Sequence, residues 1–450
     1  MNIHFIAIGG SVMHSLAIEL KNNGHTITGS DDIIYDPAKS NLKSNNLLPS
    51  NYGWYIDNIH SELDMVILGM HAKKDNPELL EAQKKNIPTL SFPEFISRYS
   101  IDKKRVVIAG SHGKTTITGM IMHVLNDNKI KFDYLVGAKI DLLDKQVNLN
   151  NNDIIIIEGD EYLSSAIDAT PKFLYYNPDL LVVSGVAWDH FNVFPTLKSY
   201  QNAFKMLLNQ VLKMSGKIFY CDNDDFLNSF LKKSQSIHSY SLPEYLVEDG
   251  KFHILHNYKK YPMSVFGKHN LYNLQAANSI CNELGINDEN FYLSIQNFNG
   301  ASKRLSLIKN VKNKKSSIYY DFAHSPSKVS ATINALRELH PTRYLLACLE
   351  LHTFSSLSRN FLPNYSNVFL ECDEIWIYID SNTKKSKELI KIRSSFISET
   401  INHHNIIILK NKESLEAKLK NIQLLNTNLL LMSSGNFSGI NLENIFTIEI

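Results

Sequence analysis

The stretch from 105 to 125 constrains the fold more than any other part of the chain. An apolar run over 105–109 leads into the loop Gly110-Ser-His-Gly-Lys-Thr115. Apolar residues then recur at helical spacing, at Ile117, Met120, Ile121, Val124 and Leu125. A buried strand, a glycine turn and a helix N-terminus present backbone N–H groups and a helix dipole to an anion. Lys114 adds a cation and Thr115 a hydroxyl able to hold Mg²⁺, so the segment predicts nucleotide phosphate binding.

This loop is shorter than the common P-loop. The common form carries a glycine five residues before the Gly-Lys pair, where this chain has Ile108. Gly110 and Gly113 are therefore only three residues apart. A Gly-Lys-Thr run can also arise by chance in a turn, but the strand before it and the helical pattern after it favour the phosphate site.

The bulk composition describes an ordinary globular protein of several domains. A chain of 450 residues is too long for one core, and 44% hydrophobic with 20% charged residues is typical of globular proteins. The net charge of +1 provides no field to attract nucleic acid or an anionic membrane, so we expect neither as a partner. The start of the chain predicts a strand rather than a signal peptide, and no run approaches the roughly 18 apolar residues of a membrane span. Four dispersed cysteines indicate a reducing compartment, and we expect the cytoplasm.

Apolar strands alternate with helical segments, which predicts an α/β fold with parallel sheets. Strands are expected at 3–8, 26–28, 65–68, 105–109, 154–157, 180–183, 317–320, 344–349, 374–379, 406–409 and 429–432. Pattern breaks near 100–104 and 297–303 predict three domains of residues 1–100, 101–298 and 299–450. The asparagine-rich stretch 148–152 is predicted to be an exposed loop.

The N-terminal glycine turn is a weak dinucleotide signature. The fingerprint requires three glycines, and the chain has Ala7, Gly9 and Val12 at those positions. Asp31 follows the second predicted strand, where such folds place a ribose-binding acid. The two missing glycines disfavour an NAD-dependent oxidoreductase. The same strand–turn–helix could hold the pyrophosphate of a different nucleotide.

Further polar residues follow strand ends. Glu158 opens the run Glu158-Gly-Asp-Glu161 after a strand, and acids placed there are natural Mg²⁺ ligands. His190, which follows the strand at 180–183, is either a structural residue or a metal ligand. Asn270 and Asn273 lie three apart, on one side of a helix, and could grip an adenine or a ribose. Two residues of the last part of the chain could also contact a nucleotide: Arg304 a phosphate and Asp321 a ribose hydroxyl.

Together these motifs resemble the ATP-dependent Mur ligases of peptidoglycan metabolism, over essentially the whole chain and in the family's order. The markers are the short phosphate loop, Glu158 in its acidic run, Asp189-His190, His269-Asn270 with Asn273, Arg304, and Asp321-Phe-Ala-His324. The resemblance implies a Rossmann-like N-terminal domain that binds a UDP-sugar, a central P-loop ATPase domain with a mainly parallel sheet, and a Rossmann-like C-terminal domain that binds an amino acid or peptide.

The resemblance also implies a role for each marker. ATP would be bound by Gly110, Ser111, His112, Gly113, Lys114, Thr115, Thr116, Asn270, Asn273, Arg304 and Asp321. The catalytic residues would be Lys114, Glu158 and His190, and Mg²⁺ would be held by Thr115, Glu158 and His190. The UDP-sugar would be bound by Gly9, Gly10, Ser11, Asp31 and His71. The implied reaction is phosphorylation of a carboxylate by ATP, followed by attack of an amine on the acyl phosphate.

The opening segment and Gly29-Ser-Asp31 resemble the family members that use UDP-N-acetylmuramate itself. One kind adds L-alanine in synthesis, and the other attaches L-alanyl-γ-D-glutamyl-meso-diaminopimelate in recycling. Asp160-Glu-Tyr162, the segment 433–439 and the absence of an H-R-Y-T-R motif in 349–354 favour the peptide-adding kind, with the L-alanine-adding kind as the alternative. The chain departs from the family pattern at Ala7, Val12 and Leu163. A non-catalytic protein that retains only the sugar domain is disfavoured because Lys114, Glu158 and His190 are all present.

Overall fold

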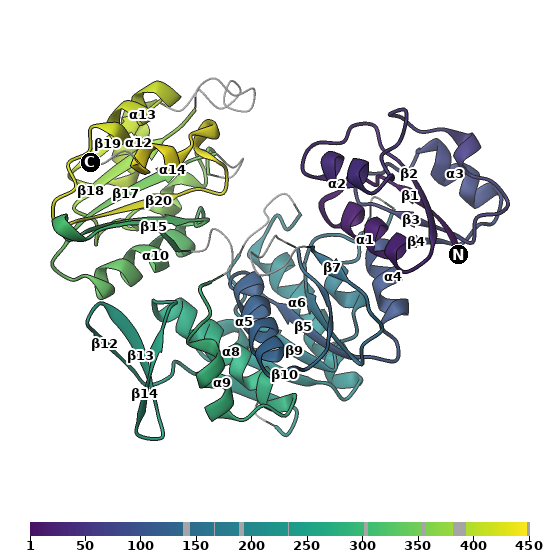
Figure 1. The fold of residues 1–450 in the computed structure, drawn as a ribbon, viewed down its shortest axis with the longest axis horizontal. Helices are drawn as coiled ribbons and strands as arrows, with labels where there is room; N and C mark the ends of the chain where they lie inside the picture. The colour runs from purple at the N-terminus through teal and green to yellow at the C-terminus, as the bar shows by residue number, and fades with distance from the viewer. Residues whose placement is uncertain are drawn as a thin grey trace. The chain divides into compact units, whose positions relative to one another are not determined.

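The computed structural model describes residues 1–137, 145–165, 167–188, 193–232, 234–300, 305–352, 356–380 and 393–447 (Figure 1). The chain divides into two compact units. The first comprises Met1–Ser241 with Tyr272–Ile295, and the second comprises Leu242–Leu271 with Gln296–Ile450. Within the first unit, residues 1–100 and 101–241 carry separate sheets, so the predicted boundary near residue 100 falls between two sheets. The division into three domains stays a prediction.

The N-terminal sheet has the strand order β2-β1-β3-β4 and is parallel throughout. Its strands are β1 (Asn2–Ile6), β2 (Thr26–Ser30), β3 (Met65–Leu68) and β4 (Thr89–Ser91), and its helices are α1 (Ser11–Asn22), α2 (Ala38–Ser44), α3 (Pro77–Lys84) and α4 (Phe92–Tyr99). Side chains alternate across a strand, so Phe5 packs in a cluster with Leu16 of α1, whereas Ile6 packs in another with Leu79 of α3. Both faces of the sheet are therefore covered, as parallel sheets require.

The second sheet of the first unit holds the phosphate loop. Its order is β11-β10-β9-β5-β8-β6-β7, and only the β6–β7 pair is antiparallel. Its strands are β5 (Lys104–Ala109), β6 (Asp133–Leu135), β7 (Val147–Asn148), β8 (Ile154–Glu158), β9 (Leu180–Val183), β10 (Lys217–Cys221) and β11 (Ile237–Tyr240). Its helices are α5 (Lys114–Asp127), α6 (Leu197–Lys213), α7 (Asp225–Phe230), α8 (Lys268–Glu283), which extends into the second unit, and α9 (Asp288–Ile295). One face packs Val107 and Ile157 against Tyr200 and Phe204 of α6. The central strands β5, β8 and β9 are thus buried, and their carboxyl ends meet at one edge.

The second unit contains two sheets. A three-stranded antiparallel sheet is formed by β12 (Tyr245–Glu248), β13 (Lys251–His256) and β14 (Lys259–Met263). The other has the order β15-β16-β20-β17-β18-β19, with β15 antiparallel and the rest parallel. Its strands are β15 (Ser306–Val311), β16 (Ser316–Asp321), β17 (Tyr344–Glu350), β18 (Glu374–Tyr378), β19 (Ile406–Leu409) and β20 (Thr427–Met432). The helices are α10 (Pro326–Leu339), α12 (Ser394–Ile401), α13 (Lys412–Lys420) and α14 (Leu442–Thr447).

The structure confirms the predicted α/β class and every predicted strand, with ends shifted by at most a few residues. The exposed loop predicted at 148–152 is wrong in part. Asn148 belongs to β7, and the side chain of Asn152 donates to Asp133 Oδ1 at 2.8 Å. Among the described residues, nine strands were not predicted: β4, β6, β7 and β10 to β15. Among the described residues, no helix is both long enough and apolar enough to span a membrane.

Candidate active site

The phosphate loop follows β5 directly and ends where α5 begins, at Lys114. Gly110 and Gly113 adopt positive φ angles of 125° and 79°, a region that side chains other than hydrogen disfavour. A Cβ on Gly110 would lie 2.3 Å from the hydroxyl of Ser184, and one on Gly113 would lie 2.2 Å from the amide oxygen of Asn273. Both glycines are therefore required by conformation and by space.

The other predicted loop residues are fixed by neighbouring strands and helices. The Ser111 hydroxyl donates to the carbonyl of Ala187 at 2.6 Å. The carbonyl of His112 accepts from the Ser184 hydroxyl, and Thr116 is buried in the first turn of α5. The segment after β9 thus holds this loop in shape at the N-terminus of α5, where the helix dipole favours an anion.

Lys114 lies in a partly enclosed ion pair that the sequence did not predict. Its Nζ donates to the Gly110 carbonyl at 2.7 Å and lies 2.8 Å from Glu161 Oε2. Glu161 is fully buried and also accepts from the Tyr200 hydroxyl at 2.8 Å. Burial acts to lower the pKa of Lys114, but nearby carboxylates, Glu161 foremost, outweigh it and raise that pKa above its ordinary value. Lys114 is therefore a fixed cation at the mouth of the phosphate cradle.

Glu158, the last residue of β8, faces the phosphate loop. Its Oε1 accepts from the Thr115 hydroxyl at 2.7 Å, and its Oε2 accepts from the Gly137 N–H at 2.9 Å. A carboxylate and a hydroxyl side by side are oxygen ligands of the kind that Mg²⁺ prefers, so the pair fits the predicted metal site. Within the described ranges, no group of three or more His, Cys, Asp and Glu side chains is arranged to hold a metal. The third predicted ligand, His190, lies outside the described residues, as does Arg304.

The remaining predicted ATP contacts are divided between the units. Asn273 lies on α8 in the first unit, next to Gly113. Asn270 lies in the second unit, where its side chain donates to the Phe266 carbonyl at 3.0 Å. Asp321 also lies in the second unit, where it accepts from the Leu305 N–H at 3.1 Å and from the Thr332 hydroxyl. Their roles toward ATP stay predictions.

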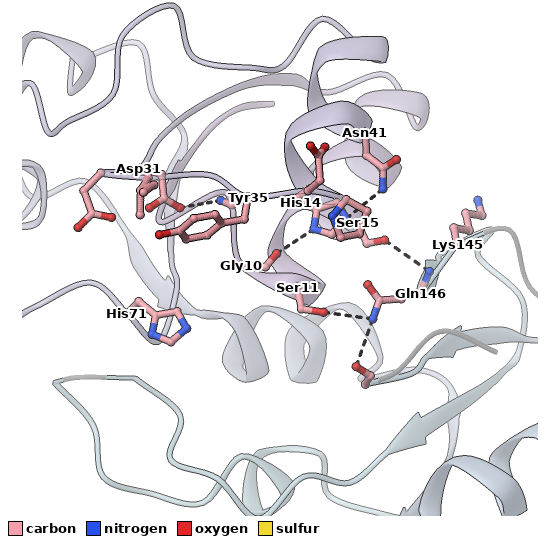
Figure 2. Close-up of a pocket in the computed structure, with 17 residues that line it drawn as sticks. Gly10, Ser11, His14, Ser15, Asp31, Tyr35, Asn41, His71, Lys145 and Gln146 are labelled. Atoms are coloured by element: carbon pink, nitrogen blue, oxygen red, sulfur yellow. Dashed lines mark hydrogen bonds between the residues drawn. The ribbon is translucent and has the colours of Figure 1, made fainter. Parts of the chain in front are cut away.

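The five residues predicted for the UDP-sugar all line one cavity of about 710 Å³ in the first unit (Figure 2). They are Gly9, Gly10, Ser11, Asp31 and His71. Asp31 Oδ2 accepts from the Gly9 N–H at 2.7 Å, and a Cβ on Gly9 would lie 2.9 Å from that oxygen. Burial raises the pKa of Asp31, although the bond from Gly9 opposes the shift. The Asp31 carboxylate thus holds the glycine turn in place through the Gly9 N–H.

Ala7, one of the departures from the family pattern, adopts a backbone conformation that favours glycine. Its φ of 65° is left-handed, a conformation suited to the glycine that is usual there. The cavity is also lined by residues that the sequence analysis missed, among them His14, Tyr35, Lys145 and Gln146. Lys145 and Gln146 belong to the segment between β6 and β7, and no local motif marks them. Only the folded hairpin brings them to the glycine turn.

Comparison with known proteins places these features in a family. The model for the "Mur ligase family, catalytic domain" matches residues 2–104, and that for the "Mur ligase middle domain" matches residues 108–281. Together these spans cover more than half of the chain, and the chain belongs to the Mur ligase family. It is an ATP-dependent, ADP-forming ligase of peptidoglycan synthesis.

Individual relatives divide between two activities. The UDP-N-acetylmuramate–L-alanine ligase of Sulfurihydrogenibium sp. is 27% identical over 97% of this chain and 95% of its own. The Escherichia coli UDP-N-acetylmuramate–L-alanyl-gamma-D-glutamyl-meso-2,6-diaminoheptandioate ligase is 28% identical over 78% of this chain and 79% of its own. Two solved structures share the fold. A murein peptide ligase from Psychrobacter arcticus matches with a TM-score of 0.65 at 22% identity, covering 100% of this chain and 99% of that one. A UDP-N-acetylmuramate-alanine ligase from Thermotoga maritima matches with 0.70 at 19%, covering 99% and 98%.

Proposed function

We propose that the protein joins the carboxylate of UDP-N-acetylmuramate to the amine of L-alanyl-γ-D-glutamyl-meso-diaminopimelate, at the expense of ATP, in peptidoglycan recycling in the cytoplasm. One observation carries the proposal most strongly: the first unit holds the phosphate loop at Lys114 and the cavity around Gly9, which we assign as two nucleotide cradles. ATP and a UDP-sugar are two nucleotides, and a ligase that activates a sugar carboxylate needs both.

In this proposal the loop residues bind and orient the ATP phosphates. Lys114 and the N-terminus of α5 neutralise charge on the transferred phosphoryl group, while the sugar carboxylate attacks it to form an acyl phosphate and ADP. Attack of the amine then gives a tetrahedral intermediate, which expels phosphate as the amide forms. Thr115, Glu158 and His190 would hold Mg²⁺, which supplies further charge neutralisation. No protein nucleophile is required, because positioning and electrostatics account for catalysis of this kind.

The choice of amine rests on the sequence. Asp160-Glu-Tyr162 and the segment 433–439 resemble the peptide-adding members, and 349–354 lacks the motif of the L-alanine-adding members. The second candidate is UDP-N-acetylmuramate–L-alanine ligase. It is favoured by L-alanine ligases that align with nearly the whole chain, as the Sulfurihydrogenibium relative does.

Phosphate release from ATP, measured with UDP-N-acetylmuramate and each amine in turn, tests the assignment. The proposal predicts release with the tripeptide, confirmed by mass spectrometry of the amide product, and at least tenfold slower release with L-alanine. Phosphate release with UDP-N-acetylmuramate and L-alanine, but not with the tripeptide, would identify the protein as the second candidate. Release that does not need UDP-N-acetylmuramate would contradict both.

A further inference from the structure

A chain of hydrogen bonds joins the two nucleotide cradles, and Gln146 lies in its middle. It begins at the phosphate loop, where Thr115 donates to Glu158 Oε1 at 2.7 Å. The other oxygen of this carboxylate accepts from the Gly137 N–H at 2.9 Å. The carbonyl of Gly137 accepts in turn from Gln146 Nε2 at 3.2 Å.

The same side-chain amide of Gln146 reaches the glycine turn of the sugar cavity. Its Nε2 lies 3.4 Å from the hydroxyl of Ser11, the first residue of α1, and its backbone N–H lies 3.4 Å from the hydroxyl of Ser15 (Figure 2). A carboxamide has two N–H donors, which suits one bond to a carbonyl and one to a hydroxyl. Each 3.4 Å contact is long and individually weak. Gln146 nevertheless contacts both the glycine turn and the Gly137 peptide.

We infer that Gln146 is a positioning residue that couples occupation of the sugar cavity to the orientation of Glu158, and so to binding of Mg²⁺ and ATP. The inference rests on the proposed function, since it requires UDP-N-acetylmuramate to occupy the cavity. A ligand that holds the Ser11 hydroxyl in one orientation also restrains the side-chain amide of Gln146. That amide in turn restrains the Gly137 peptide through its bond to the carbonyl. The N–H of that peptide then holds one oxygen of Glu158 in place while the other faces Thr115.

The neighbouring contacts separate this path from the other bonds of the same segment. A Cβ built on Gly137 would lie 3.6 Å from the carboxyl carbon of Glu158, an ordinary van der Waals distance, so this peptide lies directly beside the carboxylate. The segment is tied to α1 at other points as well. Lys145 Nζ lies 2.6 Å from Glu19 Oε2, and the side chain of Asn23 donates to the Leu149 carbonyl at 2.7 Å. These bonds hold the segment against α1 but do not reach Gly137 or Glu158.

Calorimetric titration with a non-hydrolysable ATP analogue and Mg²⁺, with and without UDP-N-acetylmuramate, tests the coupling directly and needs no amine. In the unmodified protein we expect the sugar nucleotide to tighten binding of the analogue by about tenfold, within the usual range of coupling between sites. Gln146→Ala should reduce this factor to about twofold or less. The affinity of the variant for each ligand in the absence of the other should differ from that of the unmodified protein by less than about threefold, since only weak hydrogen bonds are lost.

Two further variants separate coupling from simple loss of packing. Gln146→Glu keeps the size of the side chain but turns an oxygen toward the Gly137 carbonyl, so it should lose the coupling as fully as Gln146→Ala. Asn23→Ala removes a hydrogen bond between the same two segments outside the cavity, and it should keep the tenfold factor. An unchanged factor in both Gln146 variants, or an equal loss in Asn23→Ala, would overturn the inference while leaving the proposed function intact. Failure of the unmodified protein to bind UDP-N-acetylmuramate would sink both.

Discussion

Replacing Glu161 by Gln tests whether the buried ion pair stabilises the phosphate loop. The change keeps the shape of the side chain but removes the charge that lies 2.8 Å from Lys114 Nζ. Glu161 is completely buried, whereas the side chain of Lys114 keeps 16% of its exposure and its bond to Gly110. Breaking a buried pair by removing one partner costs about 3–5 kcal/mol, and the residual exposure of Lys114 favours the lower end, about 3 kcal/mol.

The assay is differential scanning calorimetry of the variant against the unmodified protein. A folding unit of this size shifts by about 2 °C per kcal/mol, so Glu161→Gln should lower the Tm of the first unit by about 6 °C. Glu283→Gln is the matched control. It removes the partner of Lys217 at a similar distance of 2.7 Å, but at a surface where both side chains keep 25–42% of their exposure. Such pairs contribute about 0–1 kcal/mol, so the control should shift the Tm by no more than about 2 °C. Equal shifts in the two variants would refute the reasoning.

Three other changes test separate parts of the account. Lys114→Ala should lower the rate of phosphate release by about a thousandfold or more while leaving UDP-N-acetylmuramate binding unchanged by calorimetry, and a variant with the original rate would remove Lys114 from the reaction. Gly113→Ala places a Cβ 2.2 Å from Asn273 at a φ of 79°, so ATP-dependent phosphate release should fall more than about tenfold, whereas normal activity would show that the loop can relax. Burial opposes ionisation of Glu78, but bonds from His4, Ser30 and Tyr55 outweigh it and lower its pKa; its contribution to stability is therefore complete above about pH 4.5 and is lost as the pH falls through the lowered value. In Glu78→Gln, the free energy of unfolding measured by chemical denaturation should fall less steeply as the pH is lowered through the acidic range. An unchanged pH dependence would contradict this role of Glu78.

The phosphate loop could be predicted from the sequence because its chemistry is local. Strand, glycines, lysine and helix follow one another within 105–125, and the structure keeps that order. The positions of Glu158 and Asp31 could also be predicted, because each stands at the carboxyl end of a strand in its own parallel sheet. These assignments need only the order of the elements.

The partners of these residues could not be predicted, because they depend on long-range packing. Glu161 belonged to an acidic run, and nothing in the sequence pairs it with Lys114 across 47 positions. Gln146 precedes an asparagine-rich stretch that looked like a solvated loop, and only the β6–β7 hairpin carries it to Ser11. Tyr200 lies on α6, and no sequence pattern indicated that its hydroxyl donates to Glu161.

If ATP activates the carboxylate of UDP-N-acetylmuramate, an oxygen of that carboxylate passes to the released phosphate, and isotope transfer tests this most directly. UDP-N-acetylmuramate labelled with ¹⁸O in its carboxylate is incubated with ATP, Mg²⁺ and the tripeptide, and the released phosphate is analysed by mass spectrometry. Formation of an acyl phosphate passes one carboxylate oxygen to phosphorus, and the later loss of phosphate carries that oxygen away. We expect one ¹⁸O in each phosphate released by productive ligation. Ligation that releases unlabelled phosphate would contradict it.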